Sequence, residues 1–182
     1  MRADLAKHLI HFTKGRDRED AYQTLKLILQ QRRVLGSARL VRGAIPCVCF
    51  SEAPLTSLEH GLINLKSFIF GRGGRAVIYQ PEEEFGLLPE ALRWRHGRFE
   101  PTGDSPIDFT WEREWRLPVD ELRFQFDDVE VVLPDKAFRD RFIAEVESES
   151  FHTAWAYTQV LGEIAWAYDT GNPWRTVPLQ KI

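Results

Sequence analysis

The segment SPIDFTWEREWRLPVDEL, residues 105–122, constrains the fold most, because apolar and polar side chains alternate through its centre. One face of an extended chain would carry Phe109, Trp111, Trp115 and Leu117. The opposite face would carry Thr110, Glu112, Glu114 and Arg116. This period of two predicts a half-buried β-strand over 107–117. At a strand rise of about 3.3 Å per residue, the two carboxylates lie about 7 Å apart and need a cation, a proton, a ligand or solvent.

The composition is that of one globular domain spanning residues 1–182. Of the 182 residues, 43% are hydrophobic and 28% are charged, which is ordinary for a soluble protein. No apolar run approaches the ~18–20 residues of a membrane span, and MRADLAKHLIHFTKG lacks the apolar core of a signal peptide. Cys47 and Cys49 have neither disulfide geometry nor zinc-site partners, so we expect reduced thiols. A cytoplasmic protein with no membrane partner is expected.

The net charge of −3 hides an asymmetry along the chain. Residues 1–43 contain ten Lys and Arg against four acids, and residues 120–150 contain ten acids against four bases. Such a split allows an anionic ligand or a nucleic acid at one end, although it is more often solvated surface. Nucleic-acid binding therefore stays open and is not favoured.

Helices and strands interleave without a regular alternation. Strands are predicted at 7–13, 44–52, about 75–80, 107–117 and 124–134. Helices are predicted at 18–37, after Ser51 with Leu55, Leu58 and Leu62 on the inner side, at 134–150 with Asp135 as the cap, and at 153–168. These elements predict an α+β fold, a mixed β-sheet with flanking helices, and a helical C-terminal extension from about residue 135.

The acids of the 107–117 segment have two interpretations. In the first, Glu112 and Glu114 lie on a solvated strand face and are offset by Arg113 and Arg116. In the second, they form a carboxylate pair beside a cleft, where a fixed negative charge stabilises a positively charged sugar.

Two further residues lie where pockets tend to form. His11 falls at a strand end before the Lys14–Gly15 turn, either as a structural histidine or as a donor to a ribose hydroxyl or a carboxamide oxygen. Ser51 falls at a strand-to-helix junction, where it either caps the helix or faces a ligand. The remaining histidines have no spacing typical of a metal site.

Short motifs then occur in a characteristic order: HFT at 11–13, VCFSE at 48–52, FGRGG at 70–74 and WEREWR at 111–116. In this order the chain resembles the ADP-ribosyltransferase-like fold, in which a split β-sheet grips NAD. Locally, HFT…L..IL….LGS…VCFSE.P and WEREWR resemble bacterial abortive-infection phage-resistance proteins of the AbiGi type. The likeness covers about residues 8–133.

This resemblance implies a single ADP-ribosyltransferase-like domain that transfers ADP-ribose from NAD to a protein or nucleic-acid acceptor or to water. Glu114 matches the catalytic glutamate, which binds the nicotinamide ribose and stabilises its cation, and Glu112 matches the acid that orients or deprotonates the acceptor. The positions implied to bind the cofactor are His11, Thr13, Ser51, Phe50, Phe70 and Tyr79. The chain has FSE where many members have a fuller Ser-Thr-Ser pattern.

Two other functions stay open. The AbiGi-type resemblance also implies a non-catalytic antitoxin or interaction module with a cognate toxin or antitoxin partner, bound through Trp155, Trp166 and Trp174. A metal-dependent nuclease would use Glu112 and Glu114 with Asp104 or Asp108.

Overall fold

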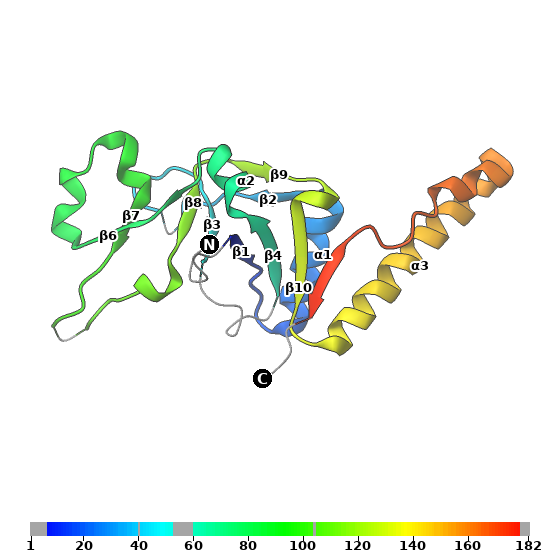
Figure 1. The fold of residues 1–182 in the computed structure, drawn as a ribbon, viewed down its shortest axis with the longest axis horizontal. Coiled ribbons are helices and arrows are strands. Elements are labelled where there is room, and N and C mark those ends of the chain that lie inside the picture. Colours follow the sequence, from blue (N-terminus) through cyan, green and yellow to red (C-terminus); the bar gives the residue numbers. More distant parts are fainter. Residues whose placement is uncertain (1–6, 40, 53–59, 104, 179–182) are drawn as a thin grey trace.

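Small β-sheets form the frame of the fold in the computed structural model, which describes residues 7–39, 41–52, 60–103 and 105–178 (Figure 1). The strands are β1 His8–Phe12, β2 Arg33–Leu35, β3 Val48–Phe50, β4 Gly61–Leu65, β5 Arg75–Ala76, β6 Ile78–Gln80, β7 His96–Arg98, β8 Trp115–Leu117, β9 Glu121–Arg123, β10 Val129–Leu133 and β11 Arg175–Pro178. The α-helices are α1 Arg18–Gln31, α2 Lys66–Gly71 and α3 Lys136–Leu161. The 3₁₀ turns are η2 Glu82–Leu87, η3 Glu90–Arg95, η4 Thr110–Glu112, η5 Phe126–Asp128 and η6 Gly162–Tyr168. This mixture confirms the predicted α+β class.

The main sheet has the strand order β1-β4-β10-β11. Its first three strands are antiparallel neighbours, and β11 runs parallel to β10. Successive residues of β1 enter different hydrophobic clusters, because neighbouring side chains of a strand point to opposite faces. Leu9 joins the larger cluster and Ile10 the smaller one. Helix α1 covers the larger cluster with Tyr22, Leu25 and Leu29.

A second sheet, β3-β8-β5, joins the main sheet at one point. Ile10 of β1 and Ser51, the residue after β3, exchange both backbone hydrogen bonds at 2.8 Å. The edge of one sheet therefore continues into the other at this bridge. Two further pairs complete the frame, the antiparallel β2-β9 and the parallel β6-β7.

Helix α1 is shorter than predicted, because residues 18–37 do not form one helix. It ends at Gln31, and Arg32 adopts the left-handed conformation at φ 50° while its backbone N–H bonds the carbonyls of Ile28 and Leu29. The next residues form β2 and place Val34 in the core. Burial of Val34 and pairing with β9 therefore outweigh helix continuation here.

The strand predicted over 107–117 is wrong in its first half. The Asp108 carboxylate accepts hydrogen bonds from the backbone N–H and the hydroxyl of Thr110, at 2.9 and 2.6 Å, which closes a turn instead. Residues 110–112 then form η4, and Arg113 turns left-handed at φ 45°. Only Trp115–Leu117 is a strand, so Glu112 and Glu114 do not occupy successive positions on one strand face. Trp111 is 61% exposed rather than buried.

The helix predicted after Ser51 falls mostly on residues 53–59, which lie outside the described residues together with Leu55 and Leu58. Leu62 lies in strand β4 and not in a helix. The Ser51 hydroxyl donates to the carbonyl of Glu112.

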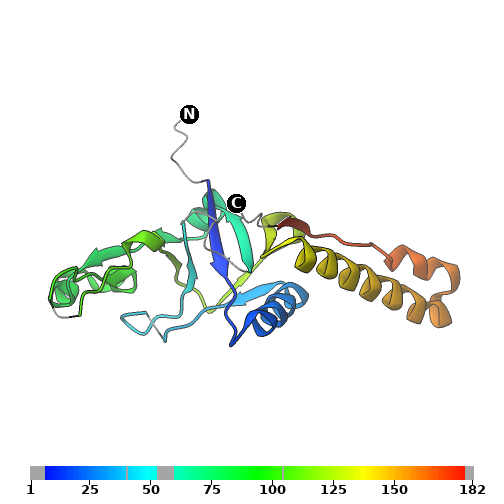
Figure 2. The same cartoon turned by 90° about the horizontal axis from the view of Figure 1, so that it is seen from below.

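The C-terminal region is one long helix where two were predicted. Helix α3 begins at Lys136 with Asp135 as its N-cap, as predicted, and continues to Leu161. It ends at Gly162, whose φ of 61° suits glycine. The chain returns through η6 to β11, a strand that was not predicted. Figures 1 and 2 show α3 projecting from the sheets on the side opposite the β6-β7 lobe.

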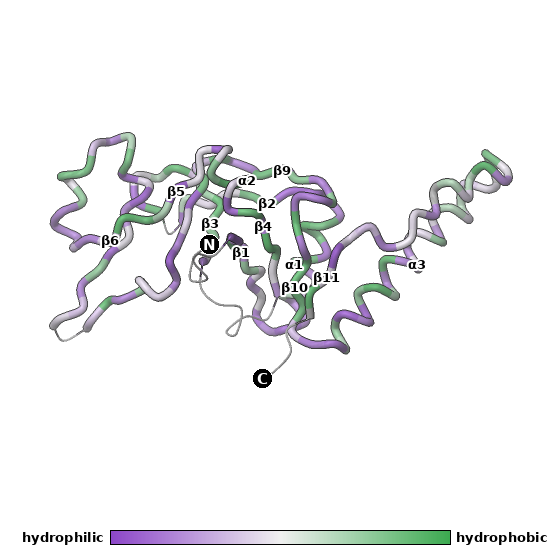
Figure 3. The backbone as a smooth tube through the Cα atoms, viewed as in Figure 1, coloured by the Kyte–Doolittle hydropathy of each residue, from purple (hydrophilic) through white to green (hydrophobic). Residues whose placement is uncertain are grey.

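Hydrophobic residues concentrate in two regions of the chain. Hydrophobic residues follow the central strands β4 and β10, as expected for a core, and appear again at the far end of α3 (Figure 3). The second region lies away from the sheets.

Candidate functional site

The carboxylate of Glu114, at the start of β8, is held by the guanidinium of Arg116. Nε of Arg116 donates to one carboxylate oxygen at 2.8 Å and Nη2 to the other at 3.0 Å. Two residues along a strand return to the same face, so the spacing itself brings these groups together. Arg116 thus supplies the cation that pairs with Glu114.

Two backbone carbonyls hold the other side of the Arg116 guanidinium. Its Nη1 donates to the carbonyls of Trp94 and His96, at 2.9 and 2.8 Å, and the residue is 5% exposed. Burial opposes the charge of this guanidinium, but the hydrogen bonds and the charge of Glu114 outweigh it and raise the pKa of Arg116. The ion pair is therefore a permanent part of the structure at neutral pH.

Glu112 differs from Glu114 because its backbone is held and its side chain is not. Its carbonyl accepts from the Ser51 hydroxyl at 2.6 Å and from the Glu52 N–H at 3.2 Å. Among the described residues its carboxylate accepts no hydrogen bond. Partial burial and the charge of Glu114 raise the pKa of Glu112, and the charge of Lys14 opposes this shift. Glu112 is the carboxylate that is free to take a proton or a ligand.

His11 lies at the bridge between the two sheets. Its Nδ1 donates to the carbonyl of Cys49 at 2.9 Å, and its ring meets Phe50 edge-on at a centroid distance of 6.0 Å. Burial lowers the pKa of His11, which the Cys49 hydrogen bond opposes and the charge of Lys14 reinforces. The imidazole is therefore neutral with Nδ1 protonated, which leaves Nε2 as an acceptor. The charge of Lys14 acts to lower the pKa of both His11 and Glu112.

The other residues predicted to bind a cofactor are dispersed. The hydroxyl of Tyr79 accepts from the backbone N–H of Glu114 at 3.0 Å, which joins it to the acidic group. Thr13 is buried, and its hydroxyl has no hydrogen-bond partner among the described residues. Phe50 is 3% exposed within the main core, so its ring offers no face to a ligand and we do not retain it as a contact. Phe70 is 53% exposed and lies elsewhere, on α2.

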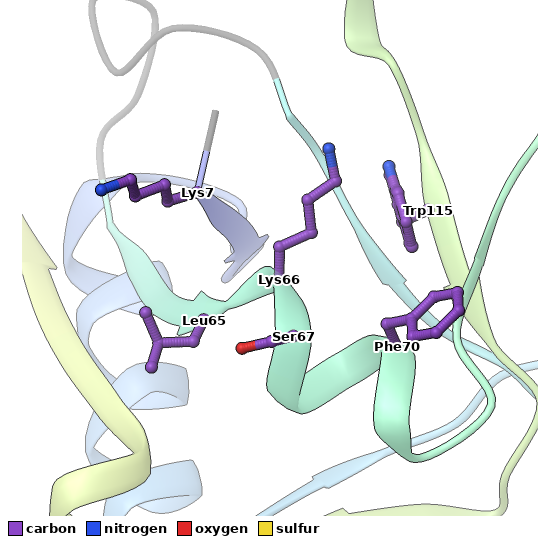
Figure 4. A pocket seen from close by; sticks show the side chains of 6 residues that line it. All are labelled: Lys7, Leu65, Lys66, Ser67, Phe70 and Trp115. Carbon is purple, nitrogen blue, oxygen red and sulfur yellow. The ribbon is translucent and has the colours of Figure 1, made fainter. Parts of the chain in front are cut away.

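A pocket of about 440 Å³ opens beside this site, a volume typical of small-molecule sites. It is lined by Lys7, Leu65, Lys66, Ser67, Phe70 and Trp115 (Figure 4). Neither His11 nor the two acids line it. Of the residues predicted from sequence, only Phe70 does so, while Trp115 was assigned to a buried strand face.

Glu52 connects the pocket to the segment that contains Glu112 and Glu114. Its carboxylate accepts from Nζ of Lys66 at 2.5 Å and from Nε1 of Trp115 at 3.0 Å, while its backbone N–H bonds the carbonyl of Glu112. Glu52 therefore contacts both the pocket residues and the backbone of Glu112. The sequence marks this residue only through its place in the CFSE motif.

The described residues do not support a metal centre or a cysteine nucleophile. Within them, no group of three or more His, Cys, Asp or Glu side chains could hold a metal ion. Asp108 is bonded to Thr110, and Asp104 lies outside the described residues. Both thiols are free, as expected, but burial raises the pKa of Cys47 to about 11 and, with the charge of Glu114, that of Cys49 to about 12. Neither is a thiolate at neutral pH.

No family model, curated protein or solved structure matches this chain significantly. Among the described helices, none combines the length and apolarity needed to cross a membrane.

Proposed function

We propose that the chain is an NAD-dependent ADP-ribosyltransferase, of the kind that serves as a toxin or a phage-defence effector. The observation that carries this proposal is the grouping beside the bridge between two sheets, where His11 bonds the carbonyl of Cys49 and Ser51 bonds the backbone carbonyl of Glu112, two residues before Glu114. A histidine on the first strand, a hydroxyl on a central strand and a glutamate late in a split sheet are the parts that the resemblance implies. We propose in addition that the sheets are arranged as in the ADP-ribosyltransferase-like fold.

Cleavage of the nicotinamide–ribose bond of NAD is favoured by a fixed negative charge beside the ribose. When NAD is bound, breaking the bond between the nicotinamide nitrogen and ribose C1′ releases neutral nicotinamide and leaves positive charge on the ribose. Each oxygen of the Glu114 carboxylate accepts one hydrogen bond from Arg116, which leaves lone pairs for a ribose hydroxyl. Its orientation is set before a ligand arrives, so little reorganisation is needed in the transition state.

Glu112 and His11 have complementary roles in this proposal. The free carboxylate of Glu112, whose pKa is raised by burial and by Glu114, accepts the proton of the attacking hydroxyl or water as its bond to C1′ forms. The unprotonated Nε2 of His11 accepts a hydrogen bond from a ribose hydroxyl. Glu114 then binds the ribose and Glu112 accepts the proton, because the carboxylate of Glu114 is already paired with Arg116.

The test is the release of free nicotinamide. The full chain is incubated with NAD, with water as the acceptor and separately with added bacterial extract, and nicotinamide is quantified by chromatography. Release that disappears in Glu112→Gln and persists in Glu147→Gln, an acid on the distant helix α3, supports the proposal. If neither incubation yields nicotinamide above the buffer control, the proposal is wrong.

A second function, as a non-catalytic interaction or antitoxin module, is favoured by one observation. The far end of α3 and η6 exposes the large apolar side chains Phe151, Trp155, Tyr157, Val160, Leu161, Ile164 and Trp166. Clustered apolar surface of this kind often marks a protein contact. Trp174 does not belong to it, because its ring packs edge-on against Phe124 and Phe126. Capture of a protein partner without any NAD consumption would favour this function.

A further inference from the structure

The walls of the pocket beside Glu52 combine aromatic faces with positive charge. Trp115 and Phe70 supply the rings, and Nζ of Lys66 lies 5.0 Å from the centroid of the Trp115 ring. Figure 4 shows both rings beside the Lys66 side chain. Phe70 is about half exposed, so one face of its ring is available at the mouth of the pocket.

One further cation lies against a ring of this pocket. The guanidinium of Arg75 lies 4.1 Å above the Phe70 ring. Lys7 also lines the pocket and makes no ion pair among the described residues, although its ammonium points away from the two rings (Figure 4). Glu52 pairs with Lys66 and accepts a hydrogen bond from Trp115, so the charge of Lys66 is balanced within the pocket wall and Arg75 supplies the cation beside the Phe70 ring.

We infer that this pocket binds a nucleobase together with its phosphate, presented by a single-stranded nucleic acid. Aromatic rings interleaved with Lys and Arg hold single strands, because each base stacks on a ring while the cations neutralise phosphates. A base paired within a duplex has no free face to offer a ring inside a pocket of this size. The strand therefore has to be unpaired where it enters.

The inference rests on the pocket and does not require that NAD be cleaved. If NAD is cleaved, the pocket also bears on the acceptor, since Glu52 bonds both the pocket residues and the backbone of Glu112. A strand bound here would lie next to the acid proposed to deprotonate the acceptor. The acceptor class would then be nucleic acid, which the sequence alone leaves open.

The experiment measures binding of a fluorescent twelve-nucleotide single strand, as DNA and as RNA, to the full chain by anisotropy. Phe70→Ala is expected to weaken binding about tenfold or more, because stacking of one base contributes about 1–3 kcal/mol. Leu27→Ala is the matched control, since Leu27 is 52% exposed on helix α1 and does not line the pocket, and it should bind as the wild type does. Arg75→Gln should reduce the slope of log affinity against log salt by about one, because its guanidinium lies over the Phe70 ring, and Lys136→Gln should not.

Competitors identify the source of the ligand. Displacement of the strand by AMP but not by the same concentration of inorganic phosphate supports a base-with-phosphate site. Equal binding by a duplex, unchanged affinity in Phe70→Ala, or binding of AMP and NAD without any strand binding would each overturn the inference. Nicotinamide release is measured in the same samples, so loss of the proposed enzyme activity is seen separately from loss of strand binding.

Discussion

Arg116 holds Glu114 through two parallel hydrogen bonds, of 2.8 and 3.0 Å, although only one residue separates them in sequence. The pair lies under the β6-β7 side of the molecule, where Arg116 also reaches the carbonyls of Trp94 and His96. One guanidinium therefore joins the candidate site to the lobe that contains η3 and β7. Because removal of one partner leaves a largely buried charge unpaired, this interaction dominates what substitutions will do here.

Arg116→Lys should lower the free energy of unfolding by about 2–4 kcal/mol, because an ammonium cannot replace two parallel hydrogen bonds and two carbonyl contacts. Urea denaturation monitored by circular dichroism measures this. Arg123→Lys is the matched control, since Arg123 also pairs with an acid two residues away, Glu121, but with a side chain 71% exposed. That change should stay within about 0.5 kcal/mol. Equal effects of the two substitutions would contradict the special role of Arg116.

Glu114→Gln should abolish nicotinamide release and also destabilise the fold. On the solvated or ligand-facing strand face that the sequence predicts, this substitution would leave the melting temperature nearly unchanged. With Arg116 7% exposed and Glu114 19% exposed in their side chains, loss of the negative charge instead costs about 1–3 kcal/mol. Thermal denaturation and the NAD assay, at a temperature where the variant remains folded, separate the two effects. An unchanged melting temperature would show that the ion pair contributes little.

Glu112→Gln should remove activity without destabilising the chain at neutral pH. The pKa of Glu112 is raised above its unfolded value by burial and by Glu114, so the folded state binds the proton more tightly than the unfolded state. Stability therefore falls as pH rises through the unfolded pKa toward the folded one. The glutamine variant lacks this loss, so it should gain stability relative to the wild type between pH 4 and pH 7. Paired denaturation curves at both pH values test the sign, and a relative gain at the lower pH would refute it.

The sequence predicts the elements with strong local signals and fails where a tertiary contact decides. Asp135 caps α3 as its position indicates, and the strand at 7–13 forms as β1 because its alternation matches two cores. The strand over 107–117 fails because the Asp108 side chain closes a turn on Thr110, a local competition that periodicity does not register. The break in α1 at Arg32 depends on pairing with β9, about ninety residues away.

The candidate site shows the same division. His11, Ser51 and the two acids are recognisable as residue types in short motifs. The structure places His11 and Ser51 beside the bridge and bonds the Ser51 hydroxyl to the backbone of Glu112, whereas the Glu114 carboxylate is bonded to Arg116. The pairing of Glu114 with Arg116 follows from a two-residue period once β8 is known. The pocket could not be predicted, because Lys7, Lys66 and Trp115 come from three separate elements and meet only in the fold.

Arg141→Gln should weaken the attachment of α3 to α1 in a way that depends on pH. The Arg141 guanidinium bonds Glu19 of α1 at 2.7 and 2.8 Å and, together with Gln23, lowers the pKa of Glu19 to about 2. A depressed acid pKa contributes stability above the unfolded value near 4.5, and this contribution is lost as pH falls toward 2. The melting temperature of the wild type should therefore fall between pH 5 and pH 2 more steeply than that of Arg141→Gln. Arg16→Gln is the control, because Arg16 pairs with Asp20 next to α1 and does not reach α3. If Arg141→Gln and the wild type lose stability in parallel over this range, the link between the helices does not depend on Glu19.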